Sequence, residues 1–428
     1  MGKYWIKFLW VILAGVLIFA AFNRHSRSKI YTYNSQLMSD KAGYYVYLPA
    51  FFIYKFNVNK FPAKIDSLTG NGFYLNHSAN KVQSKYPVGT ALLECPFFLI
   101  AHSFVYLVGE ELDGFNKTYQ NFIDICAVFY LLLGLLFLSK LLTKYYPKTI
   151  VTVSIILISL GTNLFYYTIF EGGYSHVYSF SLFSVFLYLF DIERNKPNRY
   201  NWFGLVAICS LIILVRQMNI LFILIAFISF DTQFKLVKGK KIIDWVVAIF
   251  ICLVVLSPQI IYNFYLTKGP YFYSYQNEHF IYLFAPKIKE VLFGYKNGWI
   301  TTNLIHVFTV LGTVLLYKKN KQISIGIMSM LIVCTYLYAS WWSYELGCAY
   351  GHRGFIDIYP MLTIGLAEFC LIVDKINKKP IRNIIFILVI LCVILNIKYI
   401  YTYDSCWPVS TTRSDFNLYL NFLTSPTK

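Results

Sequence analysis

The sequence predicts an all-α polytopic membrane protein, and three observations support this fold class. Apolar residues make up 57% of the 428-residue chain, whereas charged residues make up only 14%, well below the share of about 25% in soluble domains. The apolar residues form blocks of about 17 to 25, the length that a helix needs to cross roughly 30 Å of hydrocarbon. The polar connectors are short, so we expect a single membrane domain over residues 1–428.

The apolar blocks follow one another along the chain. Residues 1–22 have a basic start and a weak cleavage site, and we expect an uncleaved first helix rather than a signal peptide. The block at residues 89–108 contains Glu94, Pro96 and His102, which makes it a poor span. The other blocks are residues 120–139, 149–169, 176–190, 202–215, 217–230, 243–262, 299–317, 323–341, 356–373 and 383–402.

The positions of the basic connectors predict the membrane topology of these blocks. Cytoplasmic loops collect Lys and Arg, and the basic connectors are "KLLTKYYPK", "DIERNKPNR", "FKLVKGKK", "KKNK" and "DKINKKPIR". All of them share the side of the N-terminus only if residues 89–108 do not cross. We therefore expect about eleven transmembrane helices, a cytoplasmic N-terminus, a first outer loop over residues 23–118 and an outer tail over residues 403–428. Residues 89–108 then form a helix or helix pair at the outer interface.

The net charge of +18 is spread over these connectors and forms no continuous basic stripe, so we expect anionic membrane lipids as partners and no nucleic acid. The chain contains no P-loop, Rossmann fingerprint, HExxH or GxSxG motif, which weakens ATP-driven transport, metalloprotease and serine-hydrolase functions. Most of the nine cysteines lie inside apolar blocks without metal-ligand spacing. Cys348 and Cys406 could form a disulfide, but spacing alone does not establish one.

The first outer loop begins with "SDKAGYYVYLPAFF" at residues 39–52. Tyr44, Tyr47, Phe51 and Tyr54 follow at close to helical spacing, which predicts an interfacial helix with a belt of aromatic rings. Asp40 stands at the start of this helix. Spacing leaves it either as the cap of the helix or as a functional carboxylate on the outer membrane surface.

Two further outer segments carry polar residues at sharp turns. Lys85 and Tyr86 in "KYPVG" form either an ordinary turn with a snorkelling lysine or a cation site for a lipid phosphate. Glu171 and His176 flank two glycines in "FEGGYSHVYSF". They either cap the loop or let a ligand come close to the backbone.

The later outer loops add cationic candidates. His352 and Arg353 lie between glycines in "GCAYGHRGF", and arginine suits bidentate recognition of phosphate. Arg216 interrupts the positive-inside pattern at an outward turn, a position that is more often functional than not. Glu278 follows a cluster of aromatic residues that either lines a sugar or lipid groove or lies at head-group level.

Over most of its length the chain resembles the membrane-embedded GT-C glycosyltransferases, in particular the protein mannosyltransferase and aminoarabinose transferase type that use polyprenyl-phosphate sugars. The resemblance rests on the order of Asp40, "KYPVGTALLECPFF", "GTNLFYY", "YSHVYSF", "VRQMN", "LFGYKNG" and "WW" followed by "GHRGF". It implies a GT-C-like bundle with its site facing outward, in a bacterial inner membrane. It also implies inverting transfer of a hexose or pentose from a polyprenyl-phosphate donor to a lipid, glycan or protein acceptor.

The resemblance also assigns roles to residues. Asp40 matches the family's catalytic base, and Glu171, with His176 beside it, stands where relatives carry a second acid. Lys85, Arg353 and Arg216 are then the cations that stabilise the leaving phosphate. We expect the remaining substrate-binding residues to be Tyr44, Tyr86, Glu278 and His352.

Two departures from the family are visible. Asp40 is followed by Lys41, whereas many relatives carry a second acid there. This leaves metal binding open, with a divalent cation as the one candidate cofactor. The chain also lacks the large soluble domain of oligosaccharyltransferases, which argues against transfer of whole oligosaccharides to protein.

Two other functions remain as alternatives. A transporter or flippase of lipid-linked glycans predicts inverted halves and charges in the middle of the membrane, whereas the hydropathy shows no half-to-half repeat and the charges gather at one surface. A ligase or polymerase of surface polysaccharide would use related donors and differ mainly in its acceptor.

Overall fold

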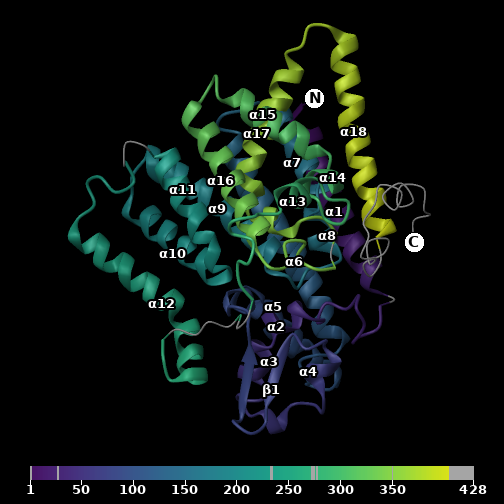
Figure 1. Cartoon of the computed structure of the whole chain (residues 1–428), viewed down its shortest axis with the longest axis vertical. Coiled ribbons are helices and arrows are strands. Elements are labelled where there is room, and N and C mark those ends of the chain that lie inside the picture. Colours follow the sequence, from purple (N-terminus) through teal and green to yellow (C-terminus); the bar gives the residue numbers. More distant parts are fainter. Residues whose placement is uncertain are drawn as a thin grey trace.

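The computed structural model describes residues 2–26, 28–231, 235–270, 275, 278–348 and 350–403. Within these ranges most of the chain is helical, and the described strands form one short antiparallel hairpin, β1 (Phe73–Asn76) and β2 (Lys81–Ser84). Figure 1 shows the helices of the bundle packed together, with the start of α18 at one end of the molecule and β1 at the other. The all-α fold class is thereby confirmed.

Among the described residues, eight helices are long and apolar enough to cross a membrane, and four shorter apolar helices accompany them. The long ones are α1 (Gly2–Ser26), α5 (Gly89–Val108), α6 (Lys117–Leu142), α9 (Ser175–Asn195), α12 (Ile242–Thr267), α16 (Lys321–Ser340), α17 (Tyr359–Asp374) with the preceding 3₁₀ turn η3 (Arg353–Ile358), and α18 (Lys379–Thr402). The shorter ones are α7 (Lys148–Leu160), α10 (Arg199–Val215), α11 (Ile220–Phe230), which extends the turn η2 (Gln217–Asn219), and α15 (Ile305–Leu316).

Every apolar block predicted as a span contains one of these helices. The block at 149–169 is divided between α7 and the short helix α8 (Leu164–Ile169), and the block at 299–317 between α14 (Trp299–Thr302) and α15. Residues 89–108 form one continuous helix, α5, which packs against α6 and α10 and against the first outer loop. Its placement at the interface stays a prediction.

Ion pairs join the basic connectors to one another. Lys144 after α6 pairs with Asp191 near the end of α9 at 2.9 Å, and Lys240 before α12 pairs with Glu193 in the same turn of α9. Lys319 after α15 lies 3.0 Å from Glu368 of α17. The Lys319 ammonium also lies 4.6 Å from the ring centre of Tyr146, so these contacts bring the first four of the five basic connectors together at one end of the bundle, in agreement with the charge rule. The assignment of that end to the cytoplasm stays a prediction.

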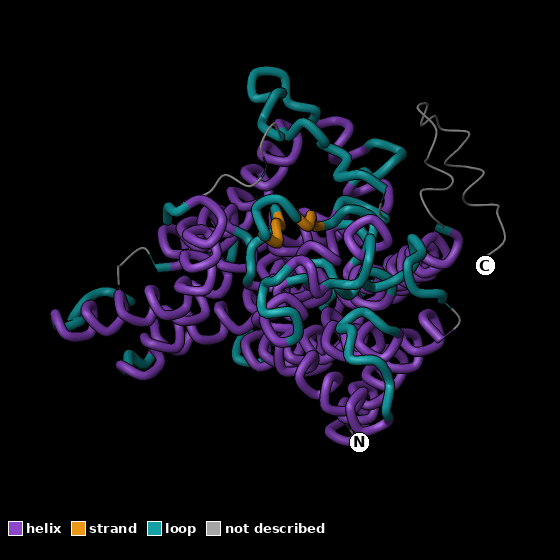
Figure 2. Tube along the Cα trace, turned by 90° about the horizontal axis from the view of Figure 1, so that it is seen from below, coloured by secondary structure: helices purple, strands orange, loops and turns teal. Residues whose placement is uncertain are grey.

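The segment predicted as the first outer loop, for which we keep that name, forms a compact cap at the other end of the bundle; its placement outside the membrane stays a prediction. It contains the helices α2 (Asp40–Tyr45), α3 (Tyr47–Phe52) and α4 (Ile65–Leu68), the 3₁₀ turn η1 (Val58–Lys60) and the hairpin β1–β2. Seen from that end, the hairpin and the loops lie over the helices (Figure 2). Hydroxyls of α12 fasten the hairpin, because the Ser84 amide donates to the Tyr262 hydroxyl at 2.8 Å and the Val82 amide donates to the Tyr265 hydroxyl at 3.0 Å.

The predicted aromatic belt is wrong. The stretch forms two short helices rather than one, because Pro49 has no N–H to continue the hydrogen-bond ladder across the junction at residue 46. Tyr44, Tyr47 and Tyr54 are buried, and only Phe51 is exposed. The hydroxyls of Tyr47 and Tyr54 donate to backbone carbonyl oxygens of the loop, so these phenols hold the core of the cap together.

Candidate functional site

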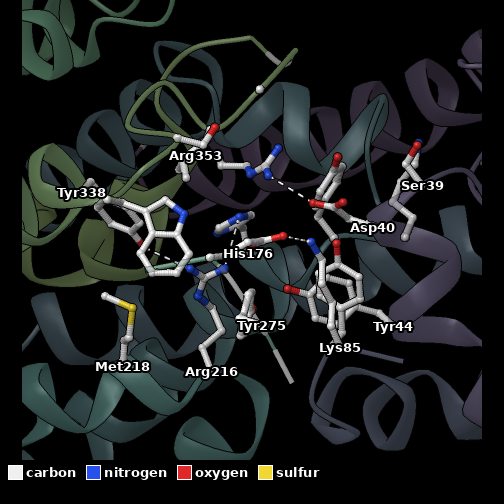
Figure 3. Close-up of a pocket in the computed structure, with 18 of the residues that line it drawn as sticks. Ser39, Asp40, Tyr44, Lys85, His176, Arg216, Met218, Tyr275, Tyr338 and Arg353 are labelled. Carbon is white, nitrogen blue, oxygen red and sulfur yellow. Dashed lines mark hydrogen bonds and ion pairs between the residues drawn. The ribbon is translucent and has the colours of Figure 1, made fainter. Parts of the chain in front are cut away.

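A cavity of about 500 Å³ lies between the first outer loop and the neighbouring ends of α9, α10 and α16. Every predicted site residue except His352 lines it: Asp40, Tyr44, Lys85, Tyr86, Glu171, His176, Arg216, Glu278 and Arg353. Figure 3 shows the cationic side chains of Lys85, Arg216 and Arg353 directed toward one shared space beside Asp40. The lining also contains aromatic rings, including Tyr33, Tyr174, Tyr275, Phe280, Trp341 and Trp342.

Asp40 is the first residue of α2, so the N-cap position belongs to Ser39, which makes no side-chain capping bond. Ser39 has a φ of 53°, a conformation that is uncommon for residues other than glycine and costs about 1–3 kcal/mol. A hydrogen bond and a close backbone approach hold Ser39 in this conformation. Its amide donates to the Thr69 carbonyl at 2.7 Å. The backbone of Gly72 lies so near that a Cβ added there would be 1.8 Å from the Ser39 carbonyl oxygen. The surrounding loop therefore fixes the backbone from which the Asp40 carboxylate enters the cavity.

Arg353 holds this carboxylate from the opposite wall. Its Nη2 donates to Oδ2 of Asp40 at 3.2 Å, and its guanidinium carbon lies 4.8 Å from the centre of the Tyr174 ring, in cation–π contact. A second link runs parallel to it, because the Tyr33 hydroxyl donates to the Cys348 carbonyl at 2.6 Å. Cys348 is disulfide-bonded; Cys406, whose pairing with Cys348 the spacing left open, lies outside the described residues.

Arg216 is oriented by a buried carboxylate. Its Nε lies 2.9 Å from Oδ2 of Asp357, while the other oxygen, Oδ1, lies 3.2 Å from Nδ1 of His176. Nη2 of Arg216 donates to the Tyr338 hydroxyl at 2.9 Å. Asp357 is fully buried and was not predicted as a site residue. The signal that could have found it is a carboxylate at the start of an apolar block, where it needs a cationic partner.

Lys85 and Tyr86 line the cavity on a third side, apart from the Asp40–Arg353 pair and from Arg216. Lys85 pairs with Glu278 at 2.8 Å. The Tyr86 ring packs against Tyr44, with 4.4 Å between ring centres. Burial raises the pKa of Tyr86 well above its ordinary value and the charge of Asp40 adds to the shift, so the phenol stays protonated beside the carboxylate.

Glu171 is engaged by a residue of the first loop. Its Oε2 lies 2.6 Å from Nζ of Lys41, and both side chains are almost entirely buried. The two glycines that follow Glu171 are needed for packing within the chain rather than for the predicted approach of a ligand. A Cβ on Gly172 would lie 2.8 Å from the Cβ of Ala127, and a Cβ on Gly173 would lie 3.0 Å from the Cβ of Lys41.

The residues present do not fit a divalent cation. Such an ion requires several oxygen ligands, whereas Asp40 is paired with Arg353 and Glu171 with Lys41. Across the described ranges there is no group of three or more His, Cys, Asp or Glu side chains that could hold a metal ion. The candidate cofactor of the sequence analysis therefore has no site among these carboxylates.

His352 lies behind the cavity wall rather than on it. Its ring packs against Tyr338 and Phe355, with 5.1 and 5.0 Å between ring centres. Nε2 lies 2.9 Å from the Tyr344 carbonyl oxygen, which selects the neutral tautomer that donates from Nε2. Burial lowers the pKa of His352 to about 3, so the ring carries no charge at neutral pH.

No family model and no curated protein matches this sequence. Solved structures do, among them the archaeal oligosaccharyltransferase AglB from Archaeoglobus fulgidus in complex with an inhibitory peptide and a dolichol-phosphate. The similarity covers 92% of this chain and 55% of AglB, with a TM-score of 0.52 and 11% sequence identity. The chain therefore shares the overall fold of the part of AglB that it matches, and it spans about half the length of that protein.

Proposed function

We propose that the chain is an integral-membrane, inverting glycosyltransferase that moves a hexose or pentose from a polyprenyl-phosphate donor to a lipid, glycan or protein acceptor. The observation that carries this proposal is the Asp40 carboxylate, which stands on the wall of a cavity that Arg353, Arg216 and Lys85 also line. A base and several cations in one cavity are what sugar transfer from a phosphate requires. The dolichol-phosphate bound to AglB supports a lipid phosphate as the donor.

In the proposed reaction, Asp40 accepts the proton of the acceptor nucleophile as that atom attacks the anomeric carbon. The new bond forms on the face opposite the phosphate, and the bond between the anomeric carbon and the phosphate oxygen breaks. The lipid phosphate leaves with the electron pair. Configuration at the anomeric carbon is therefore inverted.

The leaving phosphate gains negative charge during this step, and fixed cations stabilise it without reorganisation. Arg353 and Arg216 are held by Asp40 and Asp357 respectively, so their guanidinium groups are oriented before substrate arrives. Lys85 adds a more mobile charge from the third side, since its side chain is 36% exposed. Glu171 and His176 line the same cavity; in this proposal Glu171 supports the base and His176 supports Arg216.

The charge distribution supports an enzyme over a transporter or flippase. The ionisable residues that line the cavity come from loops and helix ends, whereas a transporter requires them at the membrane midplane, near broken helices. We assign the cavity to the outer face and the ion-paired connectors to the cytoplasm. Labelling of a single cysteine introduced into "KKNK" tests this topology: reaction with an impermeant reagent from outside would overturn it.

Comparison of surface glycans and glycoproteins by mass spectrometry tests the function. Cells that lack the chain should lose one sugar modification, and the wild-type chain should restore it whereas the Asp40→Asn variant should not. Purified protein should transfer the same sugar from a synthetic polyprenyl-phosphate donor. An unchanged glycan profile together with no transfer in vitro would overturn the proposal.

A further inference from the structure

The buried pair of Lys41 and Glu171 carries an inference about the site's need for metal. We propose that the Lys41 ammonium is a built-in cation that occupies the position a divalent metal would take beside Glu171, so that the site needs no metal ion. This inference rests on the proposed function, because it treats the cavity as the site where substrate binds. Its test uses metal binding and thermal stability, neither of which requires sugar transfer.

Lys41 and Glu171 form a short ion pair that is shielded from solvent. Nζ of Lys41 lies 2.6 Å from Oε2 of Glu171, and the two side chains are 2% and 8% exposed. A lysine is almost never buried to this extent unless its charge is paired. Both residues also line the cavity, so the ammonium stands at the wall where the two acids face the substrate space.

The backbone around Lys41 is shaped to admit this side chain. A Cβ on Gly173 would lie 3.0 and 3.3 Å from the Cβ and Cγ of Lys41, and 2.8 Å from the carbonyl oxygen of Gln36. The Gly173 amide in turn donates to the Gln36 side-chain oxygen at 3.2 Å. Only a residue without a side chain leaves room for the lysine stem to reach Glu171.

The negative charges of Asp40 and Glu171 are each balanced by a side-chain cation, without an added ion. Asp40 has Arg353 at 3.2 Å, and Glu171 has Lys41 at 2.6 Å. The two cations flank one ring, because the Arg353 guanidinium and the Lys41 ammonium lie 4.8 and 6.0 Å from the centre of Tyr174. A metal ion that entered here would meet two fixed positive charges and would have to displace one of them.

The test compares purified full-length wild-type protein with three variants, Lys41→Glu, Lys41→Glu/Glu171→Gln and Glu171→Gln. Bound Mn²⁺ is measured by elemental analysis after dialysis, and melting temperature is measured with Mn²⁺ and with EDTA. Wild-type protein should retain no Mn²⁺ in the cavity and show the same melting temperature in both conditions. Lys41→Glu places a third carboxylate beside Asp40 and Glu171, and it should gain bound Mn²⁺ and a melting temperature that Mn²⁺ raises.

The double variant is the matched control, because it keeps the new carboxylate but removes the old one, and it should lose the gained response. Absence of any Mn²⁺ response in folded Lys41→Glu would overturn the inference. Wild-type protein alone decides the question if Lys41→Glu does not fold. One bound Mn²⁺ that Glu171→Gln abolishes, or a melting temperature that EDTA lowers, would show that the wild-type site takes a metal.

Discussion

Oδ2 of Asp40 accepts a hydrogen bond from Nη2 of Arg353 at 3.2 Å, although 313 residues separate the two in the chain. The contact closes the cavity between the first outer loop and the loop that precedes α17. It places the proposed base next to a cation that the proposed leaving group also needs.

Asp40→Asn should lower sugar transfer by about 10² to 10⁴-fold, because the amide cannot accept the acceptor's proton. Transfer of a labelled sugar from a polyprenyl-phosphate donor measures the effect, and melting temperature reports the fold. Glu111→Gln is the matched control, since Glu111 is an exposed carboxylate of the same loop. A fully active Asp40→Asn variant would remove Asp40 from the role of base.

Arg353→Lys should lower kcat/KM for the donor by about tenfold to a hundredfold. The lysine keeps the charge but loses the planar, multiply donating guanidinium that reaches Asp40 and covers Tyr174. Hydrogen bonds to charged groups contribute about 1.5–3 kcal/mol, which corresponds to that range. Arg199→Lys, at an exposed ion pair of a basic connector, should leave the donor kinetics unchanged. If Arg353→Lys keeps the wild-type kcat/KM for the donor, as the control should, Arg353 does not bind the phosphate.

Lys85→Ala should raise KM for the donor by about tenfold and change kcat less, because a partly exposed ammonium assists binding of the phosphate more than the bond-breaking step. Initial rates over a range of donor concentrations separate the two effects. Lys60→Ala removes an exposed lysine of the same loop and should behave as wild type. A Lys85→Ala variant with unaltered KM would exclude this lysine from donor binding.

Asp357→Ala should destabilise the protein by about 3–5 kcal/mol, because it leaves the Arg216 charge buried without its carboxylate. Melting temperature in detergent measures the loss. Asp374→Ala, at the exposed end of the following helix α17, should have little effect. Asp357→Asn, which keeps the shape, should fold better than Asp357→Ala yet still weaken donor use. Donor kinetics equal to wild type in Asp357→Asn would show that Asp357 does not act through Arg216.

His352 should make the fold less stable in acid. The unfolded chain takes up a proton on His352 below its ordinary pKa of 6.5, whereas burial lowers the folded pKa to about 3. Stability from this residue is therefore full above pH 6.5 and falls as the pH drops toward 3. Between pH 6.5 and 5 the loss is about 2 kcal/mol. Melting temperatures of wild type and His352→Gln, measured across this pH interval, check the prediction. The variant should lose less stability than wild type. An equal loss in both proteins would show that His352 is not the cause.

The apolar blocks and the side shared by the basic connectors could be predicted because both are local properties of the sequence. Counting spans also grouped Asp40, Arg216 and Arg353 on one side, and the three residues line one cavity; that this side faces outward stays a prediction. The pairing between these loops could not be predicted, because no local pattern says which cation meets which acid. Lys41 was visible only as a departure from relatives, and its contact with Glu171 depends on the path of the whole first loop.

The aromatic residues of the first loop show the same limit. Helical spacing predicted a lipid-facing belt, but burial depends on what packs against the helices: Tyr44 packs against Tyr86 of the same loop and Tyr47 against Tyr262 of α12. Two carboxylates that lie within eight residues of Arg353 in the sequence are paired with other cations. Glu345 pairs with Lys296 at 2.5 Å, and Asp357 with Arg216 at 2.9 Å, which leaves Arg353 to the distant Asp40.

The long separation between Asp40 and Arg353 has a consequence for biosynthesis. A ribosome adds about 5–20 residues per second, so the 313 residues between them take roughly 15–60 s to make at that rate. During that interval Asp40 has already been made, whereas its partner Arg353 has not. A nascent chain that stalls before residue 353 therefore carries the proposed base without the guanidinium that holds it, and the cavity can close only after residue 353 has been made.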